Sequence, residues 1–410
     1  MSYRYSNSFI DPGLNTLTSP SPSGSYTQYG GIWKLSAASA AQGAGTWATP
    51  PAPHLLSWGN NNNGQLGISN ITNYSSPKQV GALTNWSVIS AQNIAFVSIK
   101  TDGTLWSWGA NNLGQLGNGN TTKYSSPKQV GALTNWLKVS CGSYHAVAIK
   151  TDGTAWVWGY NYSGQLGIST NAGVVTAGAT SPVQLGALTN WSKSFCGGQN
   201  SFAIKTDGTL WAWGNNGQGQ LGLGNRTNYS SPKQVGSLTN WLSIASGYYL
   251  TVGLQTNGTI WSWGQNNYGQ LGLGNTTSYS SPKQVGSLTT WLNATATYGS
   301  VTAIKTDGTL WSWGYNTAGQ LGIGNTTNYS SPKQIGSLTN WAVISGAGAS
   351  QAAIYGIKSD GSLWAWGYNA QGQLGLGNIT NYSSPKQVGS LTTWSTISIS
   401  QNSTFGIAKT

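Results

Sequence analysis

Trp108-Gly109-Ala110-Asn111-Asn112-Leu113-Gly114-Gln115-Leu116-Gly117 is the stretch that decides the fold, because the chain carries seven versions of it. Every version contains Gly-Gln-Leu-Gly, with its glutamine at position 65, 115, 165, 220, 270, 320 or 373. A unit of about 50 residues that recurs along 410 residues predicts one repeat architecture instead of several unrelated domains. A residue that every copy carries is explained first by the fold, so a specific function has to be sought where the copies differ.

The remainder of each copy has the pattern of short strands and tight turns. Residues 145–156 read His-Ala-Val-Ala-Ile-Lys-Thr-Asp-Gly-Thr-Ala-Trp, with β-branched and aromatic residues on both sides of Asp-Gly. Asp-Gly accepts the positive φ that a tight hairpin turn requires. About four such strands per copy is typical of one propeller blade. The sequence therefore predicts an all-β fold, a seven-bladed β-propeller.

Twenty of the 22 tryptophans occupy three repeated places. One set precedes glycine (58 to 366), one follows Asn or Thr (86 to 394), and one begins Leu-Trp-x-Trp (106 to 364). Large flat side chains fill the wedge between neighbouring blades, so we expect all twenty to be buried there. A ladder of indoles that stacks on sugars is the alternative, but its presence in every copy favours packing.

The two ends of the repeat array complement each other. The last copy stops at residues 407–410, where the other copies continue into a further strand, and the first copy begins with that strand at 55–59. We therefore expect ring closure through the pairing of two segments, which leaves no free sheet edge at the junction. The closing residues would be Leu55, Leu56, Trp58, Phe405 and Ile407. The expected domains are an N-terminal extended arm at 1–54 and the propeller at 55–410.

Charged residues are scarce in this chain. They make up 6% of it, against roughly 25% in ordinary soluble proteins, and the formal net charge is +12. The excess of Lys and Arg favours contact with acidic surfaces such as phosphate, lipopolysaccharide or an acidic protein, although a solvated face is the simpler explanation of repeated lysines. No run of about 18 apolar residues is present, so we expect no membrane insertion.

Residues suited to catalysis or metal binding are few. The two histidines are His54 and His145, and Cys141 and Cys196 stand at equivalent places, where we expect small buried hydrophobes. Such a set cannot form a repeated metal site. Every Asp except Asp11 lies in a predicted hairpin turn, and no Glu is available for a carboxylate pair. We therefore predict no enzyme activity, no catalytic residues, no cofactor and no metal.

Two sets of lysines recur. The first follows Ser-Pro and is the better candidate for an acidic partner, with Val183 interrupting it; its members are Lys78, Lys128, Lys233, Lys283, Lys333 and Lys386. The second lies two residues before the turn Asp positions, so we expect those carboxylates to compensate it. Its members are Lys100, Lys150, Lys205, Lys305, Lys358 and Lys409.

Departures from the repeat are the candidates for specificity. The largest is the insertion at 170–179, in which Asn171, Val174 and Val175 form a candidate specificity loop. A second departure lies at 346–351. The pair before Gly-Gln also varies and is expected to line one rim, as loops on one propeller face commonly bind ligands. Examples of this pair are Asn62-Asn63, Tyr162-Ser163, Asn267-Tyr268 and Ala370-Gln371. Unselected loop drift is the alternative explanation.

These repeats resemble the regulator-of-chromosome-condensation (RCC) repeat family, whose fold is a seven-bladed propeller. The resemblance rests on Trp-Gly-x-Asn-x-x-Gly-Gln-Leu-Gly, on the Ser-Pro that follows, and on Val-Ala-Ile-Lys-Thr-Asp-Gly-Thr-x-Trp, and it covers about 55–410. One copy, at 142–145, also matches the family's Gly-x-x-His. Family members include nucleotide exchange factors, chromatin binders and a bacterial enzyme-inhibiting protein. No acidic exchange loop is visible, which argues against exchange activity.

The leader resembles a segment that is common in marine phage virion proteins. It reads Gly-Gly-Ile-Trp-Lys-Leu-Ser at 30–36, then a small-residue run, then Thr-Trp-Ala-Thr-Pro at 46–50. The resemblance implies an anchor to other virion proteins through Trp33, Leu35 and Trp47. These side chains could instead be plain packing residues of an arm.

Three functional hypotheses follow. The first is a non-enzymatic phage virion protein (tail, fibre or capsid-associated), multimeric in its assembly, whose propeller serves docking and adhesion to a host-surface glycan or envelope. The second is a secreted or cell-surface bacterial propeller that binds a protein, as the family's inhibitor does. The third is a lectin or enzyme that uses rim aromatics. We expect no sequence-specific nucleic-acid partner.

Overall fold

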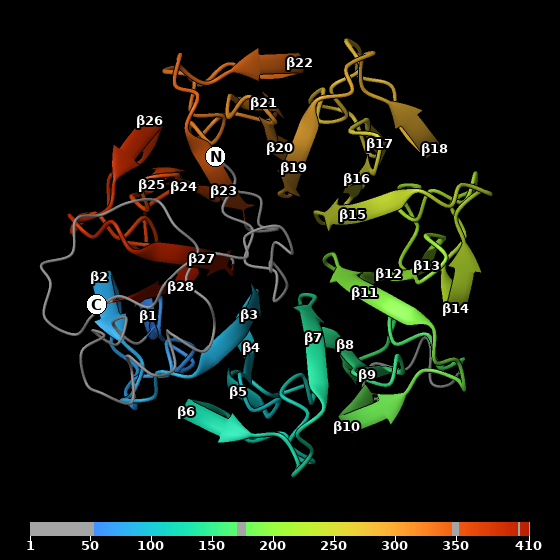
Figure 1. Ribbon diagram of the computed structural model, residues 1–410, viewed down its shortest axis with the longest axis vertical. Coiled ribbons are helices and arrows are strands. Elements are labelled where there is room, and N and C mark those ends of the chain that lie inside the picture. Colours follow the sequence, from blue (N-terminus) through green and yellow to red (C-terminus); the bar gives the residue numbers. More distant parts are fainter. Residues whose placement is uncertain (1–52, 170–177, 347–351, 401, 410) are drawn as a thin grey trace, which may run out of the picture. The chain divides into compact units, whose positions relative to one another are not determined.

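The computed structural model describes residues 53–169, 178–346, 352–400 and 402–409. These residues form 28 strands in seven four-stranded antiparallel sheets, and the sheets surround a central axis (Figure 1). The prediction of an all-β, seven-bladed propeller is confirmed. Figure 1 also shows the colours running around the ring from β1 to β28, so blades that follow one another in the sequence are neighbours in space.

One blade illustrates the order of strands. From the axis outward it contains β3 (Trp86–Gln92), β4 (Ala95–Lys100), β5 (Leu105–Gly109) and β6 (Tyr124–Gln129). The other internal blades are β7 (Trp136–Cys141), β8 (His145–Lys150), β9 (Ala155–Tyr160), β10 (Gly178–Gln184); β11 (Trp191–Cys196), β12 (Asn200–Lys205), β13 (Leu210–Gly214), β14 (Tyr229–Gln234); β15 (Trp241–Ser246), β16 (Leu250–Gln255), β17 (Ile260–Gly264), β18 (Tyr279–Gln284); β19 (Trp291–Ala296), β20 (Ser300–Lys305), β21 (Leu310–Gly314), β22 (Tyr329–Gln334); and β23 (Trp341–Gly346), β24 (Ala353–Lys358), β25 (Leu363–Gly367), β26 (Tyr382–Gln387).

The register of the strands gives the propeller two different faces. Trp86 pairs with Lys100, so the Asp-Gly hairpin that follows β4 lies at the same end of the sheet as the start of β3. We call this side the hairpin face. The turn between β3 and β4 and the loop between β5 and β6, which holds Gly-Gln-Leu-Gly, lie at the opposite end. We call that side the loop face.

The ring closes through the two ends of the described chain. β1 (Pro53–Gly59) pairs with β28 (Ser403–Lys409) in the sheet β2-β1-β28-β27, which also contains β2 (Tyr74–Gln79) and β27 (Trp394–Ile399). Leu55 faces Ile407 and Ser57 faces Phe405 in this pairing. The predicted closure is confirmed, and the strand begins two residues earlier than the expected 55.

The Gly-Gln-Leu-Gly motif ties each blade to the next. Trp108 Nε1 donates a hydrogen bond to the carbonyl of Gln65 over 3.0 Å. The Gln65 side chain accepts the amide of Asn63 over 2.8 Å, which fixes the loop. Gly67, at φ +71°, leaves room for the indole, because a Cβ there would lie 2.7 Å from Trp108 Nε1. The same indole bond recurs around the whole ring from Trp158, Trp213, Trp263, Trp313, Trp366 and Trp58 to Gln115, Gln165, Gln220, Gln270, Gln320 and Gln373.

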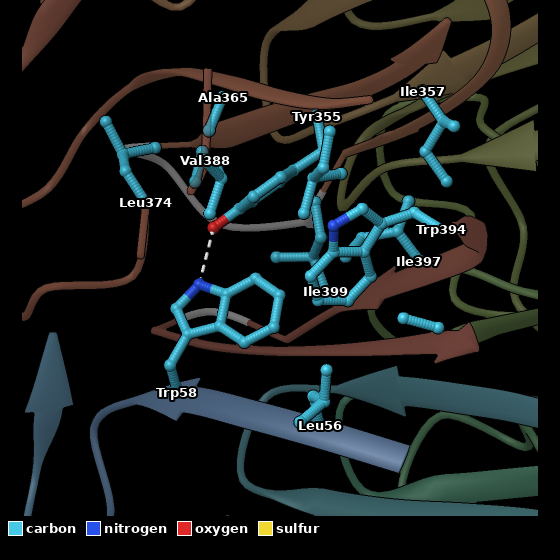
Figure 2. Packing of buried hydrophobic residues seen from close by; sticks show 13 residues of the cluster. Leu56, Trp58, Tyr355, Ile357, Ala365, Leu374, Val388, Trp394, Ile397 and Ile399 are labelled. Atoms are coloured by element: carbon cyan, nitrogen blue, oxygen red, sulfur yellow. Dashed lines mark hydrogen bonds between the residues drawn. The ribbon is translucent and has the colours of Figure 1, made fainter. Parts of the chain in front are cut away.

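Tryptophans fill the wedges between blades, with one exception to the prediction. The sets that contain Trp58 and Trp86 are buried. The set that contains Trp106 is only half-buried, because it stands beside the hairpin turn and donates Nε1 to Thr104 Oγ1 over 2.8 Å. Burial of all twenty is therefore wrong for this third set. At the closing blade, Figure 2 shows Trp58 pointing to Tyr355 within one apolar cluster.

Candidate binding surfaces

Two sets of predicted residues lie outside the part of the chain that the structure describes. They are the anchor residues Trp33, Leu35 and Trp47 and the specificity-loop residues Asn171, Val174 and Val175. Both assignments stay predictions. The departure at 346–351 lies outside as well, except for Gly346 at the end of β23.

The first lysine set lies on the outermost strands, on the rim of the propeller. All six side chains are exposed, and each ammonium group sits over the tyrosine that begins its own strand. Lys78 Nζ, for example, lies 5.3 Å from the centre of the Tyr74 ring. Val183 occupies the equivalent place in β10 and is 40% exposed. The rim is therefore cationic in six blades and neutral in the seventh.

Five of the six lysines of the second set, all except Lys409, pack between indoles instead. Lys100 Nζ lies 3.6 Å from the centre of the Trp106 ring and 5.1 Å from that of Trp86. Burial lowers the pKa of Lys100, and Asp102 opposes that shift. Asp102 itself accepts hydrogen bonds from Thr104. The expectation that the turn carboxylates compensate these lysines was incomplete, because the aromatic faces hold the ammonium groups as well.

The hairpin face exposes one leucine per blade. These residues lie in the Gly-x-Leu-Thr segment that joins each outer strand to the next inner strand, and they are 38–48% exposed. They are Leu83, Leu133, Leu188, Leu238, Leu288, Leu338 and Leu391. Because they repeat in all seven blades, they form a symmetrical ring that sequence reasoning did not single out.

The loop face carries aromatic residues that only some of the blades have. In blade β7–β10, Tyr160 and Tyr162 stack with their planes 8° apart and their centres 6.2 Å apart. Tyr144, in the turn before β8, meets Tyr160 edge-on at 6.2 Å. Tyr162 is 47% exposed. Three flat rings from two separate loops therefore meet on one blade.

A second group lies two blades further on. Tyr248 and Tyr249, in the turn before β16, have centres 4.8 Å apart, and Tyr298 of the next blade lies 5.5 Å from Tyr249. Tyr268 and Tyr315 form another pair across these two blades, at 4.7 Å, and Tyr268 is 39% exposed.

The two groups form one surface, because their turns flank one shared turn: the amide of Ser143 donates to the Gly198 carbonyl over 3.0 Å, and the amide of Gly198 donates to the Gly247 carbonyl over 3.2 Å. The pKa of Tyr248 is raised by burial and then by four neighbouring phenols, two from each side, which are those of Tyr249, Tyr144, Tyr160 and Tyr298. The pKa of Tyr298 is raised by burial and by Tyr249, Tyr268 and Tyr315. We call the eight residues the tyrosine cluster: Tyr144, Tyr160, Tyr162, Tyr248, Tyr249, Tyr268, Tyr298 and Tyr315. The prediction from the variable pairs included only Tyr162 and Tyr268.

The fold does not require a tyrosine at 160. Asn215 holds this place in the next blade, and its Oδ1 accepts a hydrogen bond from Gln220 Nε2 over 2.7 Å. Where Tyr160 or Gln265 holds this place, the following glutamine nitrogen, Gln165 Nε2 or Gln270 Nε2, is buried without a partner among the described residues. An unpaired buried amide costs about 1–3 kcal/mol. A local cost of this kind is expected where a residue serves binding instead of folding.

The central channel is narrow and lined mainly by small residues. It encloses about 230 Å³ between the seven inner strands. Cys141 and Cys196 both line it, and Cys196 is half-buried instead of buried as expected. Burial raises the pKa of Cys141 to about 12, so its thiol stays protonated at neutral pH.

His145 is a packing residue. It is buried between two blades, with Nε2 2.8 Å from Ser201 Oγ, and burial lowers its pKa to about 3. Among the residues that the structure describes, no three of His, Cys, Asp and Glu come together in a way that could hold a metal ion. The described part also contains no helix that is long and apolar enough to span a membrane.

Comparison with known proteins agrees with the repeat pattern. Residues 38–355 match the description "RCC1-like domain", and residues 360–407 match "Regulator of chromosome condensation (RCC1) repeat". No curated protein sequence matches significantly.

Similar solved structures share the propeller fold. Human WBSCR16 is 18% identical with a TM-score of 0.77, and the match covers 88% of this chain and 99% of that one. Prp20p from Saccharomyces cerevisiae, described with its binding to Gsp1p and histones, is 16% identical with a TM-score of 0.75, covering 88% and 92%. Yeast RCC1 (Prp20) bound to Kap60 is 16% identical with a TM-score of 0.77, covering 97% and 96%.

Proposed function

Because this chain belongs to the RCC1-like domain family, we propose that it is a non-enzymatic binding propeller, displayed on a phage particle and anchored there through residues 1–54. The observation that carries the binding role is the tyrosine cluster. It is confined to the loop face, it draws on positions that differ between blades, and the blade of Tyr160 has a buried glutamine nitrogen, Gln165 Nε2, without a partner among the described residues. Loops that a rigid scaffold positions are the usual place for binding residues.

The residue chemistry supports binding instead of catalysis. The turn Asp side chains accept hydrogen bonds from Thr or Ser two residues later. The one histidine on a blade interface, His145, is buried and stays neutral at physiological pH. The buried imidazole is therefore closed to a substrate, and the exposed carboxylates stand singly in the turns of the hairpin face, opposite the tyrosine cluster. The propeller face therefore offers ring stacking and hydrogen bonding, without a general acid or base.

Placement on a phage particle, in the tail, a fibre or the capsid, rests on the leader sequence alone. The segments at 30–36 and 46–50 carry the resemblance to virion proteins, with Trp33, Leu35 and Trp47 as the anchor. Attachment of these residues to other virion proteins would leave the propeller free to contact the host surface. A secreted or cell-surface location is the alternative.

The location is tested on particles of the phage that encodes the chain. Immunogold labelling of purified particles with an antibody to the full-length chain is expected to decorate one substructure. A variant with Trp33→Ala and Trp47→Ala is expected to be lost from particles while it folds normally in solution. Undecorated wild-type particles, or full incorporation of the variant, would contradict the virion role.

A protein partner is the second candidate function, and the leucine ring of the hairpin face favours it. Seven exposed leucines that surround the axis offer an apolar contact to a protein. Of the solved structures with this fold, Prp20p is described with its binding to Gsp1p and histones, and yeast RCC1 (Prp20) is described bound to Kap60. The cationic rim would add attraction to an acidic partner.

A further inference from the structure

We propose that the tyrosine cluster is a binding site for a neutral oligosaccharide. This inference rests on the binding role of the loop face proposed above and names its ligand class, but it does not depend on a phage particle. Four features of the site lead to it: the arrangement of the rings, the polar groups between them, the absence of charge, and the absence of aliphatic contacts.

The rings form an extended, irregular platform. Centre-to-centre distances within it run from 4.7 Å for Tyr268 and Tyr315 to 6.4 Å for Tyr248 and Tyr298. One face of a pyranose ring carries only C–H groups, and such a face packs flat on an aromatic ring. A cluster that spans the loops of blades β7–β10, β15–β18 and β19–β22 can contact several sugar units at once, and rigid tyrosines lose little entropy on binding.

Amide and hydroxyl groups lie between the two tyrosine groups. Ser163 Oγ contacts Gln199 Oε1 over 3.3 Å and Asn215 Nδ2 over 3.5 Å. Gln265, beside Tyr249, has a buried Oε1 without a partner among the described residues, although its backbone amide bonds the Tyr249 carbonyl. Sugar hydroxyls both donate and accept hydrogen bonds, so they suit this mixture of donors and acceptors.

The cluster is uncharged. Within the described chain, no lysine or arginine lies over any of its eight rings, whereas six lysines sit over the repeated tyrosines of the rim. The groups that shift the pKa of Tyr160 are burial and the phenols of Tyr162 and Tyr144, without a charged neighbour. Single-stranded nucleic acid also stacks on aromatic rings, but it needs cations along its phosphates. The acidic groups of a sialylated or sulfated glycan would find no lysine or arginine over these rings.

Aliphatic contacts lie elsewhere. The exposed leucines of the described chain are on the hairpin face or at the start of inner strands. The exposed isoleucines of the loop face, Ile71 and Ile379, lie in the β1–β2 and β25–β26 loops, which belong to other blades than the cluster, and the large exposed side chains of the cluster are Tyr162 and Tyr268. A protein partner normally buries an apolar core at its interface. Rings surrounded by amides, without such a core, favour a sugar over a protein on this face.

Gly198 sets the position of one ring. It lies in the turn of blade β11–β14, between the two tyrosine groups, where its amide donates to the Gly247 carbonyl over 3.2 Å. A Cβ at Gly198 would lie 2.4 Å from Tyr248 Cδ2. The absence of a side chain at 198 therefore lets Tyr248 lie across the neighbouring turn, which joins the two groups.

The test is a glycan array probed with the full-length chain. The array carries neutral glucan, mannan, galactan and N-acetylglucosamine oligomers together with sialylated and sulfated glycans. Wild-type protein is expected to bind a neutral member equally in low and high salt. Tyr162→Ala and Tyr268→Ala should each weaken that binding at least ten-fold, and Tyr162→Phe should keep most of it, because stacking needs the ring and not the hydroxyl. Gly198→Ala should weaken it by displacing Tyr248.

Leu133→Ala is the matched control, because Leu133 is 47% exposed, as Tyr162 is, but lies on the opposite face. Unchanged melting temperatures establish that the variants fold. Binding restricted to acidic glycans, or neutral binding that survives both tyrosine variants, would overturn the inference. If the tyrosines were needed to capture a protein and no glycan bound, the oligosaccharide inference would be overturned, but the loop face would remain the binding face. Phage particles that the antibody does not label would contradict only the virion location.

Discussion

Trp58 Nε1 donates a hydrogen bond to Tyr355 Oη over 2.9 Å, joining the first strand of the described chain to the blade before the closing one (Figure 2). Trp58 also donates to the Gln373 carbonyl over 3.0 Å, as the equivalent indoles do in every other blade. The extra partner is specific to this junction, because Phe202 and Phe405 hold the place of Tyr355 in other blades. The indole at the closing interface therefore has one acceptor more than its equivalents at the other interfaces.

We predict that Tyr355→Phe lowers the free energy of unfolding by about 1 kcal/mol, the usual net worth of one internal hydrogen bond. The loss stays small because the Gln373 carbonyl still accepts from Trp58 and from Thr404. Equilibrium denaturation in urea measures it. Tyr382→Phe, which removes a partly exposed hydroxyl bonded to Asn378, is the control and should cost less. An equal or larger loss in the control would contradict the special role of the junction.

A pair of glycine substitutions separates backbone strain from blade packing. Gly117 and Gly131 have φ values of +72° and +63°, so alanine strains the backbone at both. A Cβ at Gly117 would lie 3.0 Å from the Trp158 ring, whereas a Cβ at Gly131 meets nothing within 4 Å. We expect Gly117→Ala to cost about 1–3 kcal/mol more than Gly131→Ala, since it forces a packed indole to move. Equal melting temperatures for the two variants would show that the glycine serves only the turn.

His145 makes stability depend on pH. Burial lowers its folded-state pKa from 6.5 to about 3, so between these values the unfolded chain binds a proton that the folded chain does not. The free energy of unfolding is therefore not reduced by His145 above pH 6.5, and it decreases as the pH falls from 6.5 towards 3. The turn carboxylates, whose pKa values are also lowered, lose their contribution only below about 3.8.

The variant His145→Asn should remove this dependence, because Asn200 already occupies the equivalent place in the next blade. Thermal unfolding between pH 6.5 and 4 measures the slope for both proteins. The wild type should lose several kcal/mol over that range, at about 1.4 kcal/mol for each unit of pKa shift, and the variant should lose much less. The same slope in both proteins would mean that another group titrates.

The two lysine sets should differ in their contact with acidic partners. We expect the triple variant Lys128→Gln, Lys233→Gln and Lys283→Gln to elute from heparin at clearly lower salt than the wild type, since these rim ammonium groups are exposed. The triple variant Lys100→Gln, Lys150→Gln and Lys358→Gln removes equal charge from groups packed against indoles and should shift elution less. Equal shifts would show that net charge alone decides the interaction.

The repeated features of the fold could be predicted from the sequence, whereas the contacts between residues that are distant in the sequence could not. The blade count, the Asp-Gly hairpins and the closure through Leu55 and Ile407 all follow from the period of about 50 residues, because each copy must satisfy the same contacts. The tyrosine cluster could not be derived that way. Tyr144 and Tyr248 are 104 positions apart in the sequence, and only the ring brings their turns to the same face. The available signal was the variation of the residue after Trp-Gly, which is Tyr at 160, 315 and 368 and Asn only at 60 and 215.

The central claim is that the tyrosine cluster of the loop face forms the binding surface, and binding to the intact host envelope tests it most directly. The full-length wild type, the double variant Tyr162→Ala/Tyr268→Ala and the double variant Leu133→Ala/Leu288→Ala would be compared in sedimentation with envelopes from the bacterial host. We predict that the tyrosine variant loses at least ten-fold in apparent affinity while the leucine variant binds as the wild type does. Undiminished binding of the tyrosine variant, with loss in the leucine variant, would place the binding surface on the hairpin face and contradict the claim.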